Sequence, residues 1–311
     1  MSPVVIAHRG ASGYLPEHTL PAKALAYAMG ADYLEQDVVA SRDGALVVLH
    51  DIHVDRVSDV ADRFPGRARA DGRYYARDFD LEELQSLSLS ERFDGDGAAV
   101  YPGRFPPGTG DFRIQTLAQE IAFIRELNAA TGRDVGIYPE IKRPAWHREE
   151  GIDVAPLLLE TLALHGYSGP EDNAYVQCFD QAELARMRED LGCCLRLVQL
   201  IGENSWHESD TDYDALRTDE GLQALGGIAD AIGPWIEHCY TIAGGAPRSR
   251  GLVEAAHRAG LIVHPYTVRS DSLQPGFASL GELLGFLFGE VRVDGVFTDF
   301  PDLVRAFIAQ R

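Results

Sequence analysis

The chain has 311 residues, of which 48 are Asp or Glu and 28 are Lys or Arg, so its formal net charge is −20 at neutral pH. Hydrophobic residues make up 45% of the chain and charged residues 24%, which is typical of globular proteins and excludes wholesale disorder. The excess negative charge argues against binding to nucleic acid or to an anionic membrane, because both need a basic surface. No apolar run is long enough to predict a membrane-spanning helix.

Short apolar runs typical of β-strands alternate along the chain with helix-like segments. The strands are predicted at 4–8, 33–39, 134–141, 174–179, 195–201, 229–233, 261–268 and 295–299, and the helices at 17–29, 117–130, 154–165, 181–191, 248–259, 280–288 and 302–309. Strands that alternate with helices predict a parallel sheet, and eight such units favour a closed (β/α)8 TIM barrel over an open doubly wound sheet. No Gly-x-Gly-x-x-Gly follows the first strand, which argues against a dinucleotide-binding fold.

Three other segments do not follow this alternation. The apolar run 45–50 has no helix before it, and it is either a hairpin partner of the second strand or a third barrel strand with a displaced helix. Residues 52–115 are rich in Asp, Arg, Gly and Pro, with one helical piece at 81–87, and residues 203–220 are polar and acidic. Long loops in a compact domain are usually functional or inserted. We therefore expect one catalytic domain, 1–311, with an insertion at 52–115 that lies over the C-terminal face of the barrel and selects the substrate.

Charged side chains interrupt two of the predicted strands. Alternation places Glu35 and Asp37 on one face of the second strand, and Glu140 and Lys142 on one face of the next barrel strand. If these faces point into the barrel, three carboxylates converge and repel one another. A divalent cation would relieve the repulsion, and oxygen ligands favour Mg²⁺ or Ca²⁺. The alternative is that the carboxylates form buried ion pairs with Lys142 and Arg9.

Histidine is the side chain best suited to proton transfer near neutral pH, and His8 and His50 both end predicted strands. Two histidines could act as acid and base on opposite sides of a scissile bond, although a single histidine is more often structural. We expect His18 to be a local cap or loop residue and His264 to pack inside the barrel. The other histidines have no comparable context and are expected in loops or at the surface: His53, His147, His165, His207, His238 and His257.

Several blocks of sequence carry a resemblance to a known family. They lie, in order, at 7–19 (AHRGASGYLPEHT), 30–37, 43–51, 138–142, 177–180, 264–269 and 297–302. Together they resemble the motifs of glycerophosphodiester phosphodiesterases, and in particular the bacterial periplasmic type, over nearly the whole chain. No basic start followed by a long apolar region is visible. We therefore expect a cytoplasmic location for the chain as it stands, and a periplasmic one if a signal peptide has been removed.

The resemblance implies a (β/α)8 barrel that hydrolyses glycerophosphodiesters to sn-glycerol 3-phosphate and an alcohol. It implies a divalent metal, Ca²⁺ in preference to Mg²⁺, held by Glu35, Asp37 and Glu140, and an acid–base pair formed by His8 and His50. The attacking oxygen would come from water or from the substrate's own glycerol 2-hydroxyl. With the metal bound, the local charge of the site would differ from the negative charge of the whole chain.

The substrate-binding residues follow partly from the resemblance and partly from position. We expect the substrate to contact Arg9, Lys142, Gln177, Phe179, Trp235 and Tyr266. Arginine and lysine bind phosphate oxygens. The three aromatic residues could form an apolar wall for the glycerol carbons, and the alternative is that they are ordinary core residues.

A small-molecule glycerophosphodiester is the expected partner, without nucleic acid or stable membrane insertion, and a homodimer stays open. Two other functions also stay open. A related barrel phosphodiesterase for lysophospholipids or phosphoinositides would favour an apolar or basic rim, whereas the segment 52–115 is polar and acidic. A non-catalytic, metal-dependent binding protein would be expected to lack one of the two histidines, and this chain has both.

Overall fold

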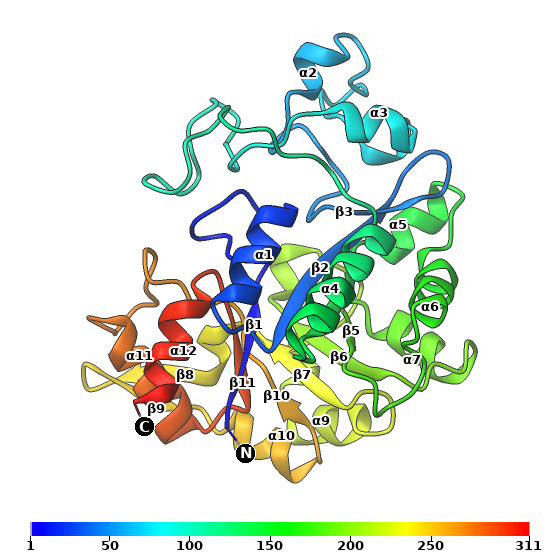
Figure 1. Ribbon diagram of the computed structural model, residues 1–311. Coiled ribbons are helices and arrows are strands. Elements are labelled where there is room, and N and C mark those ends of the chain that lie inside the picture. The colour runs from blue at the N-terminus through cyan, green and yellow to red at the C-terminus, as the bar shows by residue number, and fades with distance from the viewer. Residues whose placement is uncertain (1, 311) are drawn as a thin grey trace.

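Within residues 2–310, which the computed structural model describes, eight parallel strands form a nearly closed barrel (Figure 1). They are β1 (Val4–Ala7), β2 (Tyr33–Ala40), β4 (Gly136–Ile141), β5 (Tyr175–Cys178), β6 (Arg196–Ile201), β7 (Ala231–Pro234), β10 (Ile262–Val263) and β11 (Gly295–Thr298), in the spatial order β10-β7-β6-β5-β4-β2-β1-β11. The chain after β10 closes the ring, since Phe297 N donates to Pro265 O at 3.0 Å and Val268 N donates to Phe297 O at 2.8 Å. The predicted (β/α)8 barrel is confirmed.

Two antiparallel hairpins add to this barrel. The strand β3 (Leu46–Val48) pairs with β2 in a register that places Val47 opposite Val39, so the run 45–50 is a hairpin partner and not a barrel strand. A second hairpin, β8 (Tyr240–Ala243) with β9 (Ala246–Ser249), was not predicted from the sequence. Because β9 occupies residues predicted as helical, the following helix begins only at Leu252.

Helices surround the barrel and fill the connections. They are α1 (Leu20–Ala28), α2 (Val60–Arg63), α3 (Leu81–Ser86), α4 (Leu117–Thr131), α5 (Pro144–Glu149), α6 (Val154–Leu164), α7 (Gln181–Glu189), α8 (Tyr213–Leu216), α9 (Asp219–Leu225), α10 (Leu252–Arg258), α11 (Leu280–Phe286) and α12 (Pro301–Ala309), with the short turns η1 (Ala76–Asp78), η2 (Asn204–Trp206), η3 (Ile236–Cys239) and η4 (Leu287–Val291). The loop expected at 203–220 is thus partly helical. The first helix starts later than predicted because Thr19 caps it by accepting from Ala22 N, which leaves His18 outside the helix.

The lower part of the barrel is filled by aromatic side chains. The ring of Tyr138 stacks on Tyr175 with centroids 4.9 Å apart and meets the edge of Phe297 at 5.0 Å. The hydroxyl of Tyr138 lies 3.0 Å from Nδ1 of His264, which confirms that His264 packs inside the barrel. With this layer packed, a cavity between the strands can open only nearer their ends.

Residues 52–115 lie beyond the carboxyl ends of the strands, where α2 and α3 are seen at the top of Figure 1. This segment packs with β3 around an apolar cluster of its own, which includes Val54, Phe79, Leu84 and Ile114. No helix within residues 2–310 combines the length and the apolar character that crossing a membrane requires.

Candidate active site

A cavity of about 250 Å³ opens at the carboxyl ends of the barrel strands. All the residues predicted for the site line it: His8, Arg9, Glu35, Asp37, His50, Glu140, Lys142, Gln177, Phe179, Trp235 and Tyr266. Trp206, Arg269 and Gln274 also line it and were not predicted. They come from loops, where no strand or helix periodicity signals the direction of a side chain.

His8 follows directly after β1 and is held by a carboxylate from the other end of the chain. Its Nδ1 lies 2.7 Å from Oδ1 of Asp299, and because a carboxylate only accepts, Nδ1 carries the hydrogen. Burial lowers the pKa of His8 to about 4, and the charge of Arg9 acts in the same direction. The imidazole is therefore neutral at pH 7, with a lone pair on Nε2.

His50 follows β3 and has the same kind of support. Its Nδ1 lies 2.8 Å from Oδ1 of Asp51, whose other oxygen accepts from Arg92 at 2.6 Å. Burial lowers the pKa of His50, and Arg9 and Lys142 contribute to that shift. The cavity therefore has two neutral imidazoles, each held through Nδ1 by a carboxylate.

Three carboxylates crowd the floor of the cavity. Burial and the charge of Asp37 raise the pKa of Glu35 well above its usual range. Burial also raises the pKa of Glu140 to about 8, against the opposing charge of Lys142. The ion pairs expected as the alternative to a metal are present in part: Lys142 Nζ lies 2.6 Å from Glu140 Oε1, and Arg9 Nε lies 3.5 Å from Asp37 Oδ2. Burial is the main cause of both raised pKa values, whereas the charges of Lys142 and His50 outweigh burial at Asp37 and hold its pKa well below its usual range.

Two observations show that these residues fit a divalent cation. Ligand atoms of His18, Glu35 and Asp37 lie within 4.8 Å of one another, and all three residues are buried. In addition, Oδ1 of Asp37 is buried and has no hydrogen-bond partner among the described residues. The compact group does not include Glu140, which lines the same cavity beside Lys142.

His18 is a site residue that the sequence interpretation missed. It lies in a loop, as expected, but it is buried, and its Nε2 is 2.7 Å from Oδ2 of Asp37. Its backbone φ of 59° turns the chain so that His18 N donates to Arg9 O at 2.9 Å. The only sequence signal for such a role is that His18 falls within the block 7–19 that carries the family resemblance.

Aromatic side chains form the opposite wall of the cavity. The rings of Phe179 and Tyr266 meet edge to face with centroids 5.9 Å apart, and Trp235 meets Trp206 at 5.3 Å. Nζ of Lys142 lies 5.7 Å from the centre of the Phe179 ring. The cavity is therefore charged on one side and apolar on the other.

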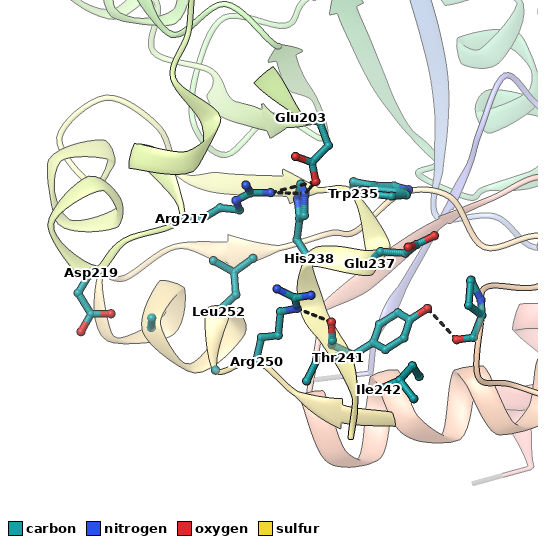
Figure 2. Close-up of a pocket in the computed structure, with 14 residues that line it drawn as sticks. Glu203, Arg217, Asp219, Trp235, Glu237, His238, Thr241, Ile242, Arg250 and Leu252 are labelled. Atoms are coloured by element: carbon teal, nitrogen blue, oxygen red, sulfur yellow. Dashed lines mark hydrogen bonds and ion pairs between the residues drawn. The ribbon is translucent and has the colours of Figure 1, made fainter. Parts of the chain in front are cut away.

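A larger cavity of about 490 Å³ lies next to the site, and Trp235 lines both (Figure 2). Here His238 is buried, with Nε2 2.8 Å from Glu203 Oε1 and also in contact with Arg217. His147 is buried too, and its Nε2 accepts from Ala40 N at 3.2 Å. The expectation that these two histidines lie in loops or at the surface is wrong: both are buried, His147 against the backbone of β2 and His238 beside Glu203 and Arg217.

Comparison with known proteins places this geometry in a family. The profile of the glycerophosphoryl diester phosphodiesterase family matches residues 8–303. The chain belongs to this family. This phosphodiesterase is 43% identical over 319 residues to the glycerophosphodiester phosphodiesterase of Haemophilus influenzae, covering 96% of this chain and 88% of that one. It is 38% identical to that of Treponema pallidum, covering 99% and 92%.

Solved structures show the same fold. A putative glycerophosphoryl diester phosphodiesterase from Silicibacter pomeroyi superposes with a TM-score of 0.75 at 23% identity, covering 99% of this chain and 94% of that one. A phosphodiesterase from Oleispira antarctica, solved in complex with the product sn-glycerol 3-phosphate, superposes with a TM-score of 0.66 at 20% identity, covering 99% and 97%. At these identities, the likeness supports the barrel fold alone.

Proposed function

We propose that this phosphodiesterase hydrolyses glycerophosphodiesters to sn-glycerol 3-phosphate and an alcohol, with a divalent cation and with His8 and His50 as the acid–base pair. The observation that carries the proposal is the pair of carboxylate-supported imidazoles on one cavity, His8 with Asp299 and His50 with Asp51. Two relatives named glycerophosphodiester phosphodiesterase, which are 43% and 38% identical to this chain, support the same reaction.

The chemistry assigned to the histidines follows from their hydrogen bonds. A carboxylate on Nδ1 fixes the tautomer and leaves Nε2 free to accept or return a proton. One imidazole would deprotonate the attacking oxygen, of water or of the glycerol 2-hydroxyl, and the other would protonate the leaving alcohol. Arg9 would stabilise the charge that develops on phosphorus, because its Nε is buried and has no hydrogen-bond acceptor among the described residues. Lys142, on the same cavity, would add a second positive charge.

The proposal includes a divalent cation, Ca²⁺ in preference to Mg²⁺, held by oxygens of Glu35, Asp37 and Glu140. The crowded carboxylates support it, as does Oδ1 of Asp37, which accepts no hydrogen bond among the described residues and lies 3.9 Å from Lys142 Nζ. His18 would act as a positioning residue, since its Nε2 holds the other oxygen of Asp37. A bound cation would neutralise the carboxylates and polarise a phosphoryl oxygen. Because the carboxylates would otherwise repel the substrate, binding as well as turnover would depend on the cation.

The remaining parts of the proposal concern the surroundings of the site. Phe179, Trp235 and Tyr266 would contact the glycerol carbons, and Gln177 would hold Glu35, toward which its Nε2 donates at 3.3 Å. Residues 52–115 would be an insertion in a single catalytic domain, 1–311.

The experiment is release of sn-glycerol 3-phosphate from a panel of diesters, with Ca²⁺ and after exhaustive chelation. His8→Ala and His50→Ala should each reduce the rate by roughly 10²–10⁴-fold. Chelation should abolish activity, and added Ca²⁺ should restore it. Wild-type turnover in both variants would refute the histidine assignment, and full activity after chelation would refute the cation. Preferential release of the alcohol from lysophospholipids, with an acylated glycerol phosphate as the other product, would favour the related barrel phosphodiesterases instead.

A further inference from the structure

A second, smaller cavity of about 220 Å³ adjoins the site, and we call it the side cavity. The cavity of about 250 Å³ that holds the predicted site residues is called the main cavity below. The side cavity shares His8, Arg9, His50 and Arg269 with it. Its other walls include Glu91, Arg92, Tyr101 and Arg104, all from the segment 52–115. The junction between the two cavities is thus formed by both proposed acid–base residues and by the arginine proposed to bind phosphate.

A diester bound across this junction would have its glycerol half in one cavity and its alcohol half in the other. A phosphorus atom placed between His8 and His50 would have one substituent in each cavity. The main cavity holds the carboxylates and the aromatic wall, which suit the hydroxyls and carbons of glycerol. The leaving alcohol therefore belongs in the side cavity. A third cavity of about 180 Å³ borders His50 and Lys142, but neither His8 nor Arg9 lines it.

One carboxylate of the side cavity, that of Glu91, has an oxygen without a hydrogen-bond partner among the described residues. Glu91 is only 3% exposed, and its Oε2 is buried with no hydrogen bond among the described residues. The carboxylate accepts a hydrogen bond from the backbone N–H of Arg92, but within residues 2–310 no Lys, Arg or His side chain forms an ion pair with it, whereas Glu17 accepts from the side chains of both Arg9 and Arg92. Asp299 is likewise occupied, by His8 and by two arginines. Glu91 is therefore the acceptor that a ligand in this cavity can use.

We propose that the side cavity binds the alcohol half of the diester and that Glu91 selects alcohols that carry a primary ammonium group, such as ethanolamine. This proposal rests on the proposed function. An ammonium would donate a hydrogen bond to Oε2 of Glu91 and offset its buried charge. A quaternary ammonium would lack that hydrogen bond. The ring of Tyr101 is already in contact with cations of the protein, since the guanidinium carbon of Arg104 lies 3.8 Å and that of Arg269 5.4 Å from the ring centre.

The electrostatic surroundings of Glu91 support this assignment. Burial raises its pKa to about 7, Glu17 acts in the same direction, and Arg104 opposes the shift. The site thus lacks a positive charge next to Glu91, although four arginines line the same cavity. Those guanidiniums are each paired with carboxylates other than Glu91. A cationic ligand would supply the positive charge that no side chain among the described residues places beside the Glu91 carboxylate.

The experiment compares two isosteric diesters on the Ca²⁺-loaded enzyme. Glycerophosphoethanolamine carries an ammonium where glycerophosphopropanol carries a methyl group. We expect kcat/KM to be roughly tenfold to a hundredfold higher for the ethanolamine diester, the effect of one buried charge-assisted hydrogen bond. In Glu91→Gln this ratio should fall close to one. Asp96→Asn, which removes an exposed carboxylate from the same segment, should keep the wild-type ratio.

The outcomes separate this proposal from the proposed function. A wild-type ratio near one, an unchanged ratio in Glu91→Gln, or a kcat/KM for glycerophosphocholine equal to that for the ethanolamine diester would each overturn the role of Glu91. Release of sn-glycerol 3-phosphate from none of the diesters would overturn the proposed function itself. If Glu91→Gln did not fold, free ethanolamine should still inhibit the wild-type enzyme more strongly than propanol, and equal inhibition would refute the assignment.

Discussion

Replacement of Asp299 by asparagine tests whether the carboxylate behind His8 sets its tautomer. One oxygen of Asp299 accepts from His8 Nδ1 at 2.7 Å, and the other accepts from Arg104 at 2.8 Å and from Arg269 at 2.7 Å. An asparagine has one acceptor and one donor end. Since two arginines need the acceptor, the amide nitrogen would face Nδ1 of His8. The histidine would then carry its hydrogen on Nε2 and lose the lone pair that faces the cavity.

The expected magnitude follows from this switch of tautomer. Loss of one acid–base group costs roughly 10²–10⁴-fold in rate, and a wrong tautomer disables the group without removing it. The fold should also lose about 3 kcal/mol, because Asp299 is buried and its ion pair with Arg269 would be gone. Asp271 still pairs with Arg104 at 2.8 Å, so the second arginine keeps a partner. Rates should be measured well below the unfolding temperature of the variant.

A double-mutant comparison isolates the path through His8. We expect kcat/KM for release of sn-glycerol 3-phosphate to be the same, within about twofold, in His8→Ala and in His8→Ala/Asp299→Asn, because the second change has nothing left to act through. Asp294→Asn is the matched control, since Asp294 holds His257 at 2.8 Å on the surface, and it should leave kcat/KM unchanged. A double variant slower by the product of the two single effects would refute the reasoning, as would Asp299→Asn within tenfold of wild type.

Three further predictions concern stability. Ca²⁺ at a hundred times its Kd should raise the unfolding free energy of the chelated enzyme by about 2.7 kcal/mol, or about 4 °C in Tm for 311 residues, and an unchanged Tm would contradict the cation site. Burial lowers the pKa of His264 and of His147 from 6.5 to about 4. As the pH falls, these histidines take up protons in the unfolded chain before they do in the folded protein. Their full contribution to the unfolding free energy is therefore present above pH 6.5 and should be lost toward pH 4, by up to roughly 3 kcal/mol for each histidine. An unfolding free energy in urea that stays constant from pH 7.5 to 5 would disprove this. Lys23→Met should cost about 3–5 kcal/mol because it leaves Glu120 buried without its partner at 2.9 Å, and Lys23→Met/Glu120→Leu should recover part of that loss in the same assay.

The parts of the site that the sequence could predict are those that depend on local alternation. Glu35 and Asp37 lie two residues apart on one strand, so any strand at that position turns both to the same side. The register of the neighbouring strand then places Glu140 opposite Asp37. Parallel strands share their carboxyl ends, which is why His8 reaches the same cavity. These arguments need only the period of a strand and the order of the elements.

The parts that escaped prediction depend on contacts between distant segments. Asp299 supports His8 across 291 residues of sequence, and no local pattern marks that pair. His18 reaches Asp37 only because a loop turns at positive φ before α1. Glu91 lies in a segment without strand or helix periodicity, so neither its burial nor the unsatisfied oxygen of its carboxylate could be read from the sequence. Sequence patterns thus located the site residues at the strand ends, whereas the residues that hold or surround those side chains come from segments without a regular pattern.

The segment 52–115 is connected by hydrogen bonds to both histidines of the proposed acid–base pair, through the carboxylates that hold them. It supplies one arginine to each supported histidine: Arg92 donates to the carboxylate behind His50 at 2.6 Å, and Arg104 donates to the carboxylate behind His8 at 2.8 Å. Each guanidinium helps to keep that carboxylate ionised and fixed in place. The same segment carries Glu91 on the wall of the side cavity. A change in the path of this segment would therefore alter the choice of alcohol and the orientation of both imidazoles together, so a shift in specificity obtained by rebuilding it should also change kcat.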